Sequence, residues 1–170
     1  SDAYVFISKR FLSQKRTLCH FDFELRNLML KEDGTIGVLD FQDLIYGPLT
    51  LDLVSLIKDL DNPISYKETE FYLKAYLSMA QDAGIDVAHD LNTLHEELEF
   101  AGLQRQLRIL GTLCRLHLRD RKSFRLPDLK QTLLYVIEAS QKYDELKEFS
   151  NFLKLKVQPV LDERLGENND

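Results

Sequence analysis

The stretch CHFDFELRNLML, residues 19–30, runs directly into KEDGTIGVLDFQD, residues 31–43, and it decides how the rest of the chain is interpreted. An Asp-Gly pair stands between two short apolar runs, NLML and TIGVLDF, which is the strongest local signal for a β-hairpin. Asp22 and Asn27 come at the entry to the first strand, and Asp40 ends the second. The hairpin therefore brings Asp40 back beside Asn27 and predicts a polar site.

These three side chains suit phosphate chemistry. The carboxylate of Asp40 and the amide oxygen of Asn27 are hard oxygen ligands, and Mg²⁺ takes one or two such groups before completing its shell with water and phosphate. The carboxylate of Asp22 lies in a loop, where it can accept a proton from a hydroxyl nucleophile. A base and a metal clamp are the minimal equipment for phosphoryl transfer, which otherwise depends on positioning and charge neutralisation.

Most of the remaining chain has helical periodicity. Thr50 suits the N-cap of the first of these helices, and Ser65 with Glu68 has the pattern of a capping box. Pro127 suits a first helical position, and Pro159 must kink or break the last helix. The predicted fold class is mainly α with a small β-hairpin, which must lie on the helices because two strands are not stable alone. The predicted helices cover residues 3–14, 49–60, 65–84, 91–118, 127–143 and 144–164.

The composition excludes several functions. The chain has 170 residues and a net charge of −6, which argues against general binding of nucleic acids because phosphate contacts need a basic face. No apolar run reaches the length of a membrane-spanning helix, so no membrane association is expected. Cys19 and Cys114 are too few for a disulfide framework and lack metal-ligand spacing. They are therefore predicted to be reduced core thiols of a cytoplasmic protein.

The spacing of the polar residues also carries a family resemblance. His20-x-Asp22 followed after four residues by Asn27, and then by Asp40-Phe-Gln, resembles the catalytic loop and metal-binding motif of kinase-fold enzymes. The longer pattern through GVLDFQDLIYGPLTLDLVSLIKD is similar to the aminoglycoside phosphotransferase and choline kinase superfamily. Within it, the chain most resembles bacterial cell-wall sugar kinases, which phosphorylate the anomeric hydroxyl of N-acetylmuramate and N-acetylglucosamine in peptidoglycan recycling. The run LQRQLRILGTLCRLHLRDRKSFRLPDL, residues 103–129, is similar to their C-terminal helices.

The resemblance implies a role for each residue of the motif. Asp22 is the implied base that orients and deprotonates the acceptor hydroxyl. Asn27 and Asp40 are the implied ligands of a Mg²⁺ ion that bridges the phosphates of ATP. His20 is implied to fix the loop by hydrogen bonds, and Asp52 to brace the loop from below. The alternative for Asp52 is an ordinary charge at a helix N-terminus.

The residues that select the acceptor are less sharply defined. Arg26 in the loop, and Arg105 and Arg108 on the long helix, are candidates to meet the carboxylate or acetamido group of a sugar. Asp43, after the metal motif, is a candidate to touch the metal or the sugar. The alternatives are a solvated face for the helix arginines and a simple loop role for Asp43.

Two residues depart from the family pattern. Phe21 stands where the family usually has Gly or a basic residue, and Glu24 stands where such loops often carry His. Both departures concern the acceptor more than the type of reaction. An aminoglycoside or choline-like acceptor is therefore the alternative to an amino sugar.

A kinase fold needs a second lobe that covers the nucleotide phosphates. The chain has 7 Gly, with none spaced as G-x-G, and no Val-Ala-x-Lys strand precedes His20. Residues 1–165 are therefore expected to form the C-terminal lobe of a protein-kinase-like α+β fold, with residues 166–170 as a disordered tail. The N-terminal nucleotide lobe is expected to be absent, which leaves the isolated chain inactive. The alternative is a non-catalytic, kinase-derived binding module that pairs with another chain.

Overall fold

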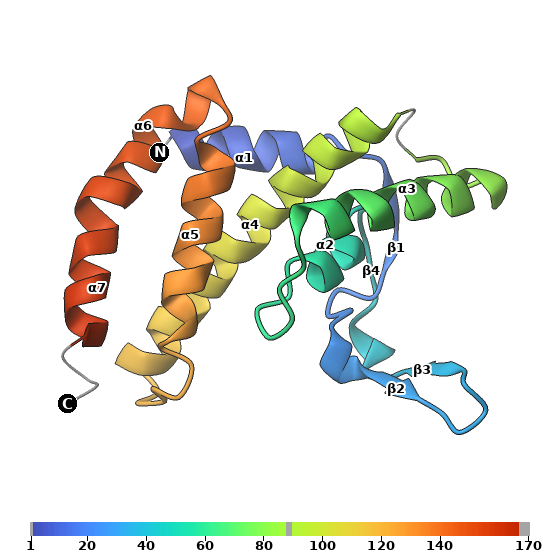
Figure 1. Cartoon of the computed structure of the whole chain (residues 1–170), viewed down its shortest axis with the longest axis horizontal. Helices are drawn as coiled ribbons and strands as arrows, with labels where there is room; N and C mark the ends of the chain where they lie inside the picture. The colour runs from blue at the N-terminus through green and yellow to red at the C-terminus, as the bar shows by residue number, and fades with distance from the viewer. Residues whose placement is uncertain (1, 88–89, 167–170) are drawn as a thin grey trace. The chain divides into compact units, whose positions relative to one another are not determined.

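The computed structural model describes residues 2–87 and 90–166, in which one helix precedes a short stretch of β-strands and the other helices follow it (Figure 1). The predicted tail, residues 166–170, lies outside the described residues except for Gly166, which ends the last helix. Within the described ranges, no helix combines the length and the apolar character needed to cross a membrane. The elements are α1 Asp2–Leu12, β1 Arg16–Cys19, β2 Leu28–Leu30, β3 Ile36–Val38, β4 Ile45–Pro48, α2 Leu51–Ile57, α3 Tyr66–Asp82, α4 Leu91–Leu118, α5 Asp128–Ser140, α6 Lys147–Phe152 and α7 Gln158–Gly166.

The predicted fold class, mainly helical with a small β-hairpin, is confirmed. Strands β2 and β3 pair antiparallel, with Leu28 opposite Val38. In the turn between them, Gly34 has a φ of 79°, a left-handed backbone that favours glycine, and its N–H donates to the Lys31 carbonyl at 3.0 Å. The Asp-Gly signal thus located the hairpin correctly.

The structure also contains a second antiparallel ladder, which the sequence did not predict. Strand β1 pairs with β4, with Cys19 opposite Ile45 and Arg16 opposite Pro48. The predicted hairpin is thus present, and this ladder is an addition to it. The two strands are separated by the whole 20–44 segment, so no local periodicity or turn signal links them.

The sequence signals for helix ends predicted the structure correctly where they depend on residues close together in the chain. The capping box of α3 is present, because Ser65 Oγ accepts from the Glu68 N–H at 3.2 Å and the Glu68 carboxylate accepts from the Ser65 N–H at 2.8 Å. Helix α4 has the predicted bounds, and α5 begins directly after Pro127 rather than at it. Thr50 is the N-cap residue of α2, as predicted, but its hydroxyl makes no capping hydrogen bond to α2. The buried hydroxyl donates instead to Gln14 Oε1 at 2.6 Å.

The break expected at Pro159 takes the form of a change in helical pitch. A 3₁₀ turn, Asp144–Leu146, leads into α6, and one π-helical turn, Leu153–Val157, joins α6 to α7. Proline lacks the N–H that would bond to the preceding turn. A wider π turn just before Pro159 lets the helix continue without that hydrogen bond.

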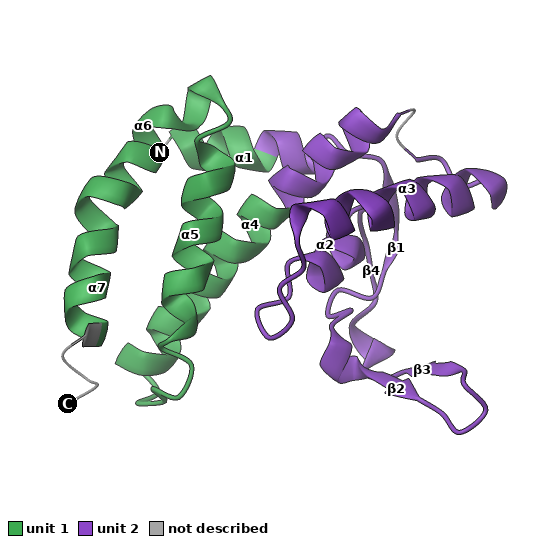
Figure 2. Ribbon diagram, viewed as in Figure 1, with its two compact units in different colours: residues 1–8, 102–170 green, residues 9–101 purple. Residues whose placement is uncertain are grey.

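The chain divides into two compact units, which Figure 2 colours separately. Unit 1 comprises residues 1–8 and 102–170, and unit 2 comprises residues 9–101. Unit 2 holds the four strands with α2 and α3, whereas α5, α6 and α7 belong to unit 1. Helices α1 and α4 contribute to both. That residues 1–165 form a single lobe remains a prediction.

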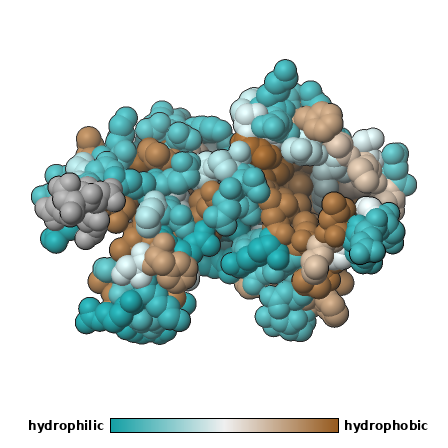
Figure 3. Space-filling model, turned by 60° about the horizontal axis from the view of Figure 1, so that its bottom comes forward, coloured by the Kyte–Doolittle hydropathy of each residue, from teal (hydrophilic) through white to brown (hydrophobic). Residues whose placement is uncertain are grey.

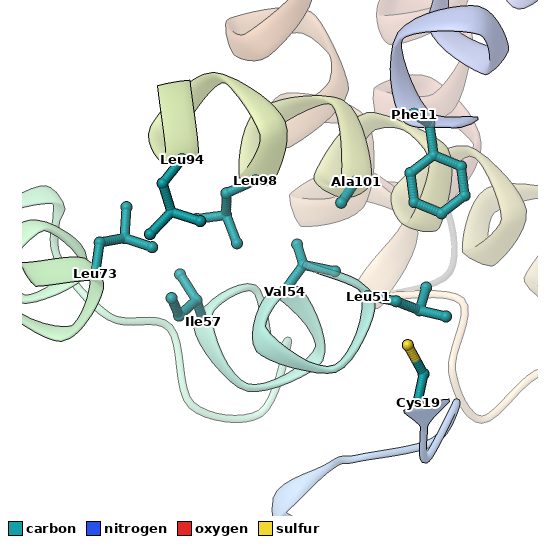
Figure 4. Close-up of a cluster of buried hydrophobic side chains, with 9 residues drawn as sticks. All are labelled: Phe11, Cys19, Leu51, Val54, Ile57, Leu73, Leu94, Leu98 and Ala101. Carbon is teal, nitrogen blue, oxygen red and sulfur yellow. The ribbon is translucent and has the colours of Figure 1, made fainter. Parts of the chain in front are cut away.

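The core of unit 2 is built around one face of α2 (Figure 4). The α2 side chains that face inward recur at steps of three, as expected for a helix with one apolar stripe. Burying each leucine-sized side chain contributes about 1.5–3 kcal/mol, so this face holds α2 firmly in place. The second residue of α2 is Asp52, whose position is therefore set by the core. The cluster contains Phe11, Cys19, Leu51, Val54, Ile57, Leu73, Leu94, Leu98 and Ala101.

Glu97, on the α4 segment within unit 2, gives a prediction about pH. Burial, with a further contribution from Glu96, raises the pKa of the Glu97 carboxyl above its ordinary value of 4.5, although Lys15 acts in the opposite direction. Among the described residues, Glu97 Oε2 is buried without a hydrogen-bond partner. The folded protein therefore holds this proton more tightly than the unfolded chain, and the stability it contributes is lost as the pH rises through the folded pKa.

Replacing Glu97 with Gln is accordingly expected to raise the Tm at pH 7 by about 1–2 °C, because the variant buries no charge. The gain over the original protein should shrink towards zero near pH 4. Thermal melts followed by circular dichroism over this pH range measure the difference. A constant gap at every pH, or a less stable variant at pH 7, would contradict the assignment.

Candidate active site

The polar segment of the sequence is held between the two ladders of unit 2. Residues 20–27 and 39–44 connect the Cys19–Ile45 pair at the end of one ladder to the Leu28–Val38 pair of the other. The Leu39 N–H donates to the Asn27 carbonyl at 2.9 Å and joins the two segments directly. The loop with Asp22 and the turn with Asp40 are therefore brought together by backbone pairing on both sides.

Asp52 fixes the start of the loop. Its Oδ2 accepts from the His20 backbone N–H at 2.6 Å, and its Oδ1 accepts from the Phe21 N–H at 2.9 Å. Hydrogen bonds to a charged acceptor are short and stronger than neutral ones. Both carboxylate oxygens of Asp52 are thus used to hold the loop backbone against the first turn of α2.

Phe21 adopts a strained backbone at this point. Its φ is 79°, in the left-handed region that a non-glycine residue occupies at a cost of about 1–3 kcal/mol. Its half-buried ring packs against the apolar cluster around α2, and its N–H bonds to Asp52. These contacts offset the strain, and the conformation gives a physical reason why glycine suits this position in the family pattern.

Asp22 and Asn27 are tied together within the loop. The Asn27 side-chain Nδ2 donates to the Asp22 carbonyl at 2.8 Å, and the Glu24 N–H donates to the same oxygen at 2.9 Å. Asn27 thereby uses its amide nitrogen inside the loop, which fixes the orientation of its side chain. Asp22, whose side chain is half-buried, comes directly after Phe21 in the chain. The fixed backbone of Phe21 therefore sets the direction in which the Asp22 side chain leaves the loop.

His20 links the loop to the turn that carries Asp40. Its side chain is only 7% exposed, and its Nε2 donates to the Leu39 carbonyl at 2.8 Å. The ring also meets Phe23 edge-on, with 5.7 Å between the ring centroids. Among the described residues, the buried Nδ1 has no hydrogen-bond partner. The contacts of His20 are thus those of a side chain that joins two segments.

Asp40 lies beyond its strand rather than at the strand end, which corrects the expectation from the sequence. Strand β3 ends at Val38, and Asp40 has a left-handed backbone with φ 62° and ψ 39°. Asp tolerates this region better than most residues. The exposed Asp40 side chain accepts from Gln42 Nε2 at 2.6 Å, so a residue of the following 3₁₀ turn, Phe41–Asp43, orients the carboxylate.

The donor set of this site fits a hard divalent cation. The described part of the chain contains no group of three or more His, Cys, Asp or Glu residues placed to hold a metal. Asn27 and Asp40 instead offer one amide oxygen and one carboxylate. The backbone hydrogen bond from Leu39 to Asn27 joins the two segments that carry these side chains. Two protein oxygens are what a cation bound largely through phosphate and water requires.

The candidate acceptor residues fall into different surroundings. Arg26 is exposed and pairs with Glu24 at 2.7 Å, inside the loop, and Asp43 is exposed at the end of its 3₁₀ turn. Arg105 is 4% exposed, which rules out the alternative of a solvated face for this residue, whereas Arg108 is exposed. Both arginines belong to unit 1, and their relation to the loop stays a prediction.

Gln42 is a site residue to which the sequence interpretation gave no role. Gln42 belongs to the Asp40-Phe-Gln motif, but its hydrogen bond to the Asp40 carboxylate depends on the left-handed backbone of Asp40. A polar residue two positions after an Asp was the available signal. That spacing is common for short side-chain contacts in turns and does not specify the turn by itself.

The two thiols differ sharply, and this gives a test of the packing beside the site. Cys19 is 1% exposed, and burial, with the nearby charge of Asp52, raises the pKa of its thiol above 9.0. Cys114 is exposed, which corrects the expectation that both are core thiols. In the folded chain, iodoacetamide is expected to modify Cys114 roughly a hundredfold faster than Cys19, because the thiolate is the reacting form.

Mass spectrometry of digests taken at intervals measures the two rates. A Cys114→Ser variant should leave only the slow thiol, and both thiols should react quickly in denaturant. Comparable rates for both in the folded chain would show that Cys19 is not buried in the cluster.

Comparison with known proteins identifies the class. Residues 5–91, which include the whole loop and turn just described, match the model of the phosphotransferase enzyme family. The chain belongs to this family, whose members have a kinase-like fold.

Three curated relatives share a name, N-acetylmuramate/N-acetylglucosamine kinase. The protein of Neisseria meningitidis serogroup B is 39% identical over 157 residues, covering 91% of this chain and 45% of the relative. The proteins of Pseudomonas putida and Pseudomonas aeruginosa are each 35% identical, covering 84% of this chain and 42% of the relative. The chain thus spans less than half the length of these relatives.

Proposed function

We propose that the chain is the catalytic part of a kinase that transfers the γ-phosphate of ATP to a hydroxyl of N-acetylmuramate or N-acetylglucosamine. The observation that carries the proposal is the joining of Asp22, Asn27 and Asp40 by the backbone contacts of the loop and turn. The names of the relatives support the choice of amino sugars. The requirement for ATP suits a cytoplasmic protein.

In the proposed reaction, the oxygen of the sugar hydroxyl forms a bond to the γ-phosphorus, and the Asp22 carboxylate accepts the proton of that hydroxyl. The bond between that phosphorus and the bridging oxygen breaks, and ADP leaves. Asn27 and Asp40 would hold Mg²⁺, which would supply positive charge to neutralise the phosphates. His20 and Asp52 keep the loop backbone in the geometry that aims Asp22 at the hydroxyl. Arg26, Asp43, Arg105 and Arg108 remain the proposed contacts to the sugar.

We propose that the β2–β3 hairpin meets the nucleotide-binding part of the full-length protein, by which we mean a protein of the relatives' length. In the ladder register, Leu28, Leu30, Ile36 and Val38 share one face of the hairpin. Leu30 is 78% and Ile36 63% exposed, and apolar side chains gather over part of the surface drawn in Figure 3. A face of this kind marks an interaction site. The 170 residues alone are accordingly expected to lack activity.

A panel of acceptors tests the proposed function. The full-length protein is expected to phosphorylate the two amino sugars with a kcat/KM at least a hundredfold above that for kanamycin or choline, since a polar site that fits one acceptor leaves unpaired groups with another. Coupled detection of ADP measures the rates. A preference for kanamycin or choline would mean that the site transfers phosphate to another class of acceptor and would contradict the choice of amino sugars. Absence of turnover with every acceptor would contradict the enzyme assignment.

The metal site gives a separate prediction. In the full-length protein, Asp40→Asn is expected to raise the Mg²⁺ concentration for half-maximal rate by roughly tenfold or more, because a neutral amide is a weaker ligand than a carboxylate. Titration of the rate with MgCl₂ at fixed ATP measures this shift. Glu32→Gln, in the exposed hairpin turn, removes a charge nearby and should leave the titration unchanged. An unaltered Mg²⁺ dependence in Asp40→Asn would exclude Asp40 as a ligand.

A further inference from the structure

Unit 1 contains an apolar pocket that the proposed reaction does not use. Its volume is about 690 Å³, and its lining comes from α1, α4, α5, the 3₁₀ turn Asp144–Leu146, α6, the π turn and α7, with all lining residues inside unit 1. Volumes of about 300–1,000 Å³ are usual for small-molecule sites. The apolar lining includes Leu107, Leu110, Leu129, Leu133, Phe149 and Leu153.

The pocket has a buried floor and an exposed aromatic rim. Leu129, Leu133 and Leu153 are each less than 8% exposed and form the floor. Tyr4 and Phe152 also line the pocket, but they are 53% and 56% exposed. An apolar chain or ring can therefore enter from solvent and leave water behind, which is the source of affinity in such sites.

The charged residues of the lining all have the same sign. They are Asp2, Glu145 and Glu148, and among the described residues none of the three is in an ion pair. Three uncompensated carboxylates attract a cation and repel an anion. The leucine floor thus favours the apolar part of a ligand, and the three carboxylates favour a cationic group on the same ligand.

Gly111 on α4 shows that this space is open. A Cβ built at Gly111, which lines the pocket, would meet no atom within 4 Å, so a side chain added here begins in open space. Cys114 lies one helical turn further along the same lining, and its thiol is exposed. The pocket therefore contains both a position that can be filled and a chemical reporter.

We propose that this pocket binds a small organic cation, an amine or quaternary ammonium group attached to an apolar chain or ring. The apolar part lies on the leucine floor, and the cationic head lies among Asp2, Glu145 and Glu148. The volume and the acidic lining residues favour such a molecule over a partner helix, which needs a long groove to seat several turns. Attraction between the head and the carboxylates weakens as salt is added.

Calorimetry on the 170-residue chain tests the proposal, with decyltrimethylammonium below its micelle concentration as the probe. Saturable binding is expected, and decanesulfonate of the same chain length should bind roughly tenfold more weakly or not at all. Gly111→Phe should weaken cation binding roughly tenfold by filling the space, whereas Gly111→Ala should leave it unchanged. The double variant Glu145→Gln/Glu148→Gln should lose most of the preference for the cation.

Alkylation locates the bound probe. Occupancy by decyltrimethylammonium should slow the reaction of Cys114 with iodoacetamide, while the slow reaction of Cys19 stays as it was. No binding, equal binding of the sulfonate, or cation binding that Gly111→Phe does not alter would each overturn the proposal. Protection of Cys114 by a basic amphipathic peptide but not by the cation would also overturn it and would assign the pocket to a protein partner.

Discussion

Replacing Asp22 with Asn in the full-length protein is expected to lower kcat about a thousandfold, with little change in the KM for ATP. A positioned general base contributes about 10²–10⁴-fold, and the amide of Asn cannot accept the proton of the acceptor hydroxyl. The backbone carbonyl of Asp22, which receives the Asn27 amide, is kept in the variant. The loss should therefore fall on the chemical step rather than on the shape of the loop.

Steady-state kinetics with both amino sugars measure this effect, and Asp82→Asn at the end of α3 is a matched control that removes an exposed charge. A variant that retained a tenth or more of the original kcat would exclude Asp22 as the base. A large rise in the KM for ATP with kcat unchanged would instead assign Asp22 to nucleotide binding.

The second large effect concerns Asp52. Asp52→Ala removes both oxygens that receive the His20 and Phe21 N–H groups and leaves these donors near a packed helix. Hydrogen bonds to a charged group contribute about 1.5–3 kcal/mol each. The 170-residue chain is therefore expected to lose about 3 kcal/mol of stability, which corresponds to a fall in Tm of about 6–12 °C at this length.

Urea titration and thermal melts of the same variant measure the loss. Asp82→Ala, another carboxylate on a unit 2 helix but exposed, should change the Tm by less than about 2 °C. In the full-length protein, Asp52→Ala should also lower kcat, because Phe21 is no longer held in its left-handed conformation. Stability close to that of the original chain would mean that the two hydrogen bonds do not brace the loop, and Asp52 would then be an ordinary helix N-terminal charge.

The sequence predicted the features that depend on neighbours in the chain. The Asp33-Gly34 turn, the Ser65–Glu68 capping box and the bounds of α4 each arise from residues a few positions apart. The motif residues of the loop belong to the same group, since their order and spacing alone suffice to resemble the family. Local signals of this kind are read correctly because no distant contact has to be known.

The features that sequence patterns missed depend on distant contacts or on backbone conformation. The β1–β4 ladder joins strands on either side of the entire loop, and the Thr50 hydroxyl bonds to Gln14 on another segment instead of capping α2. Asp40 was placed at a strand end because the apolar alternation continues to it, yet its left-handed backbone ends the strand earlier. The burial of Arg105 was not predicted, because helical spacing shows which residues share a face but not what covers that face.

The central claim is that the Asp22 loop and the Asp40 turn form one side of a phosphoryl-transfer site for amino sugars. The most direct measurement is a ³¹P NMR spectrum of the full-length protein incubated with ATP, Mg²⁺ and N-acetylmuramate or N-acetylglucosamine. We expect a new sugar-phosphate resonance, split by the anomeric proton, that grows as the γ-phosphate signal of ATP declines. Release of inorganic phosphate alone, with no phosphorylated sugar formed from either acceptor, would contradict it.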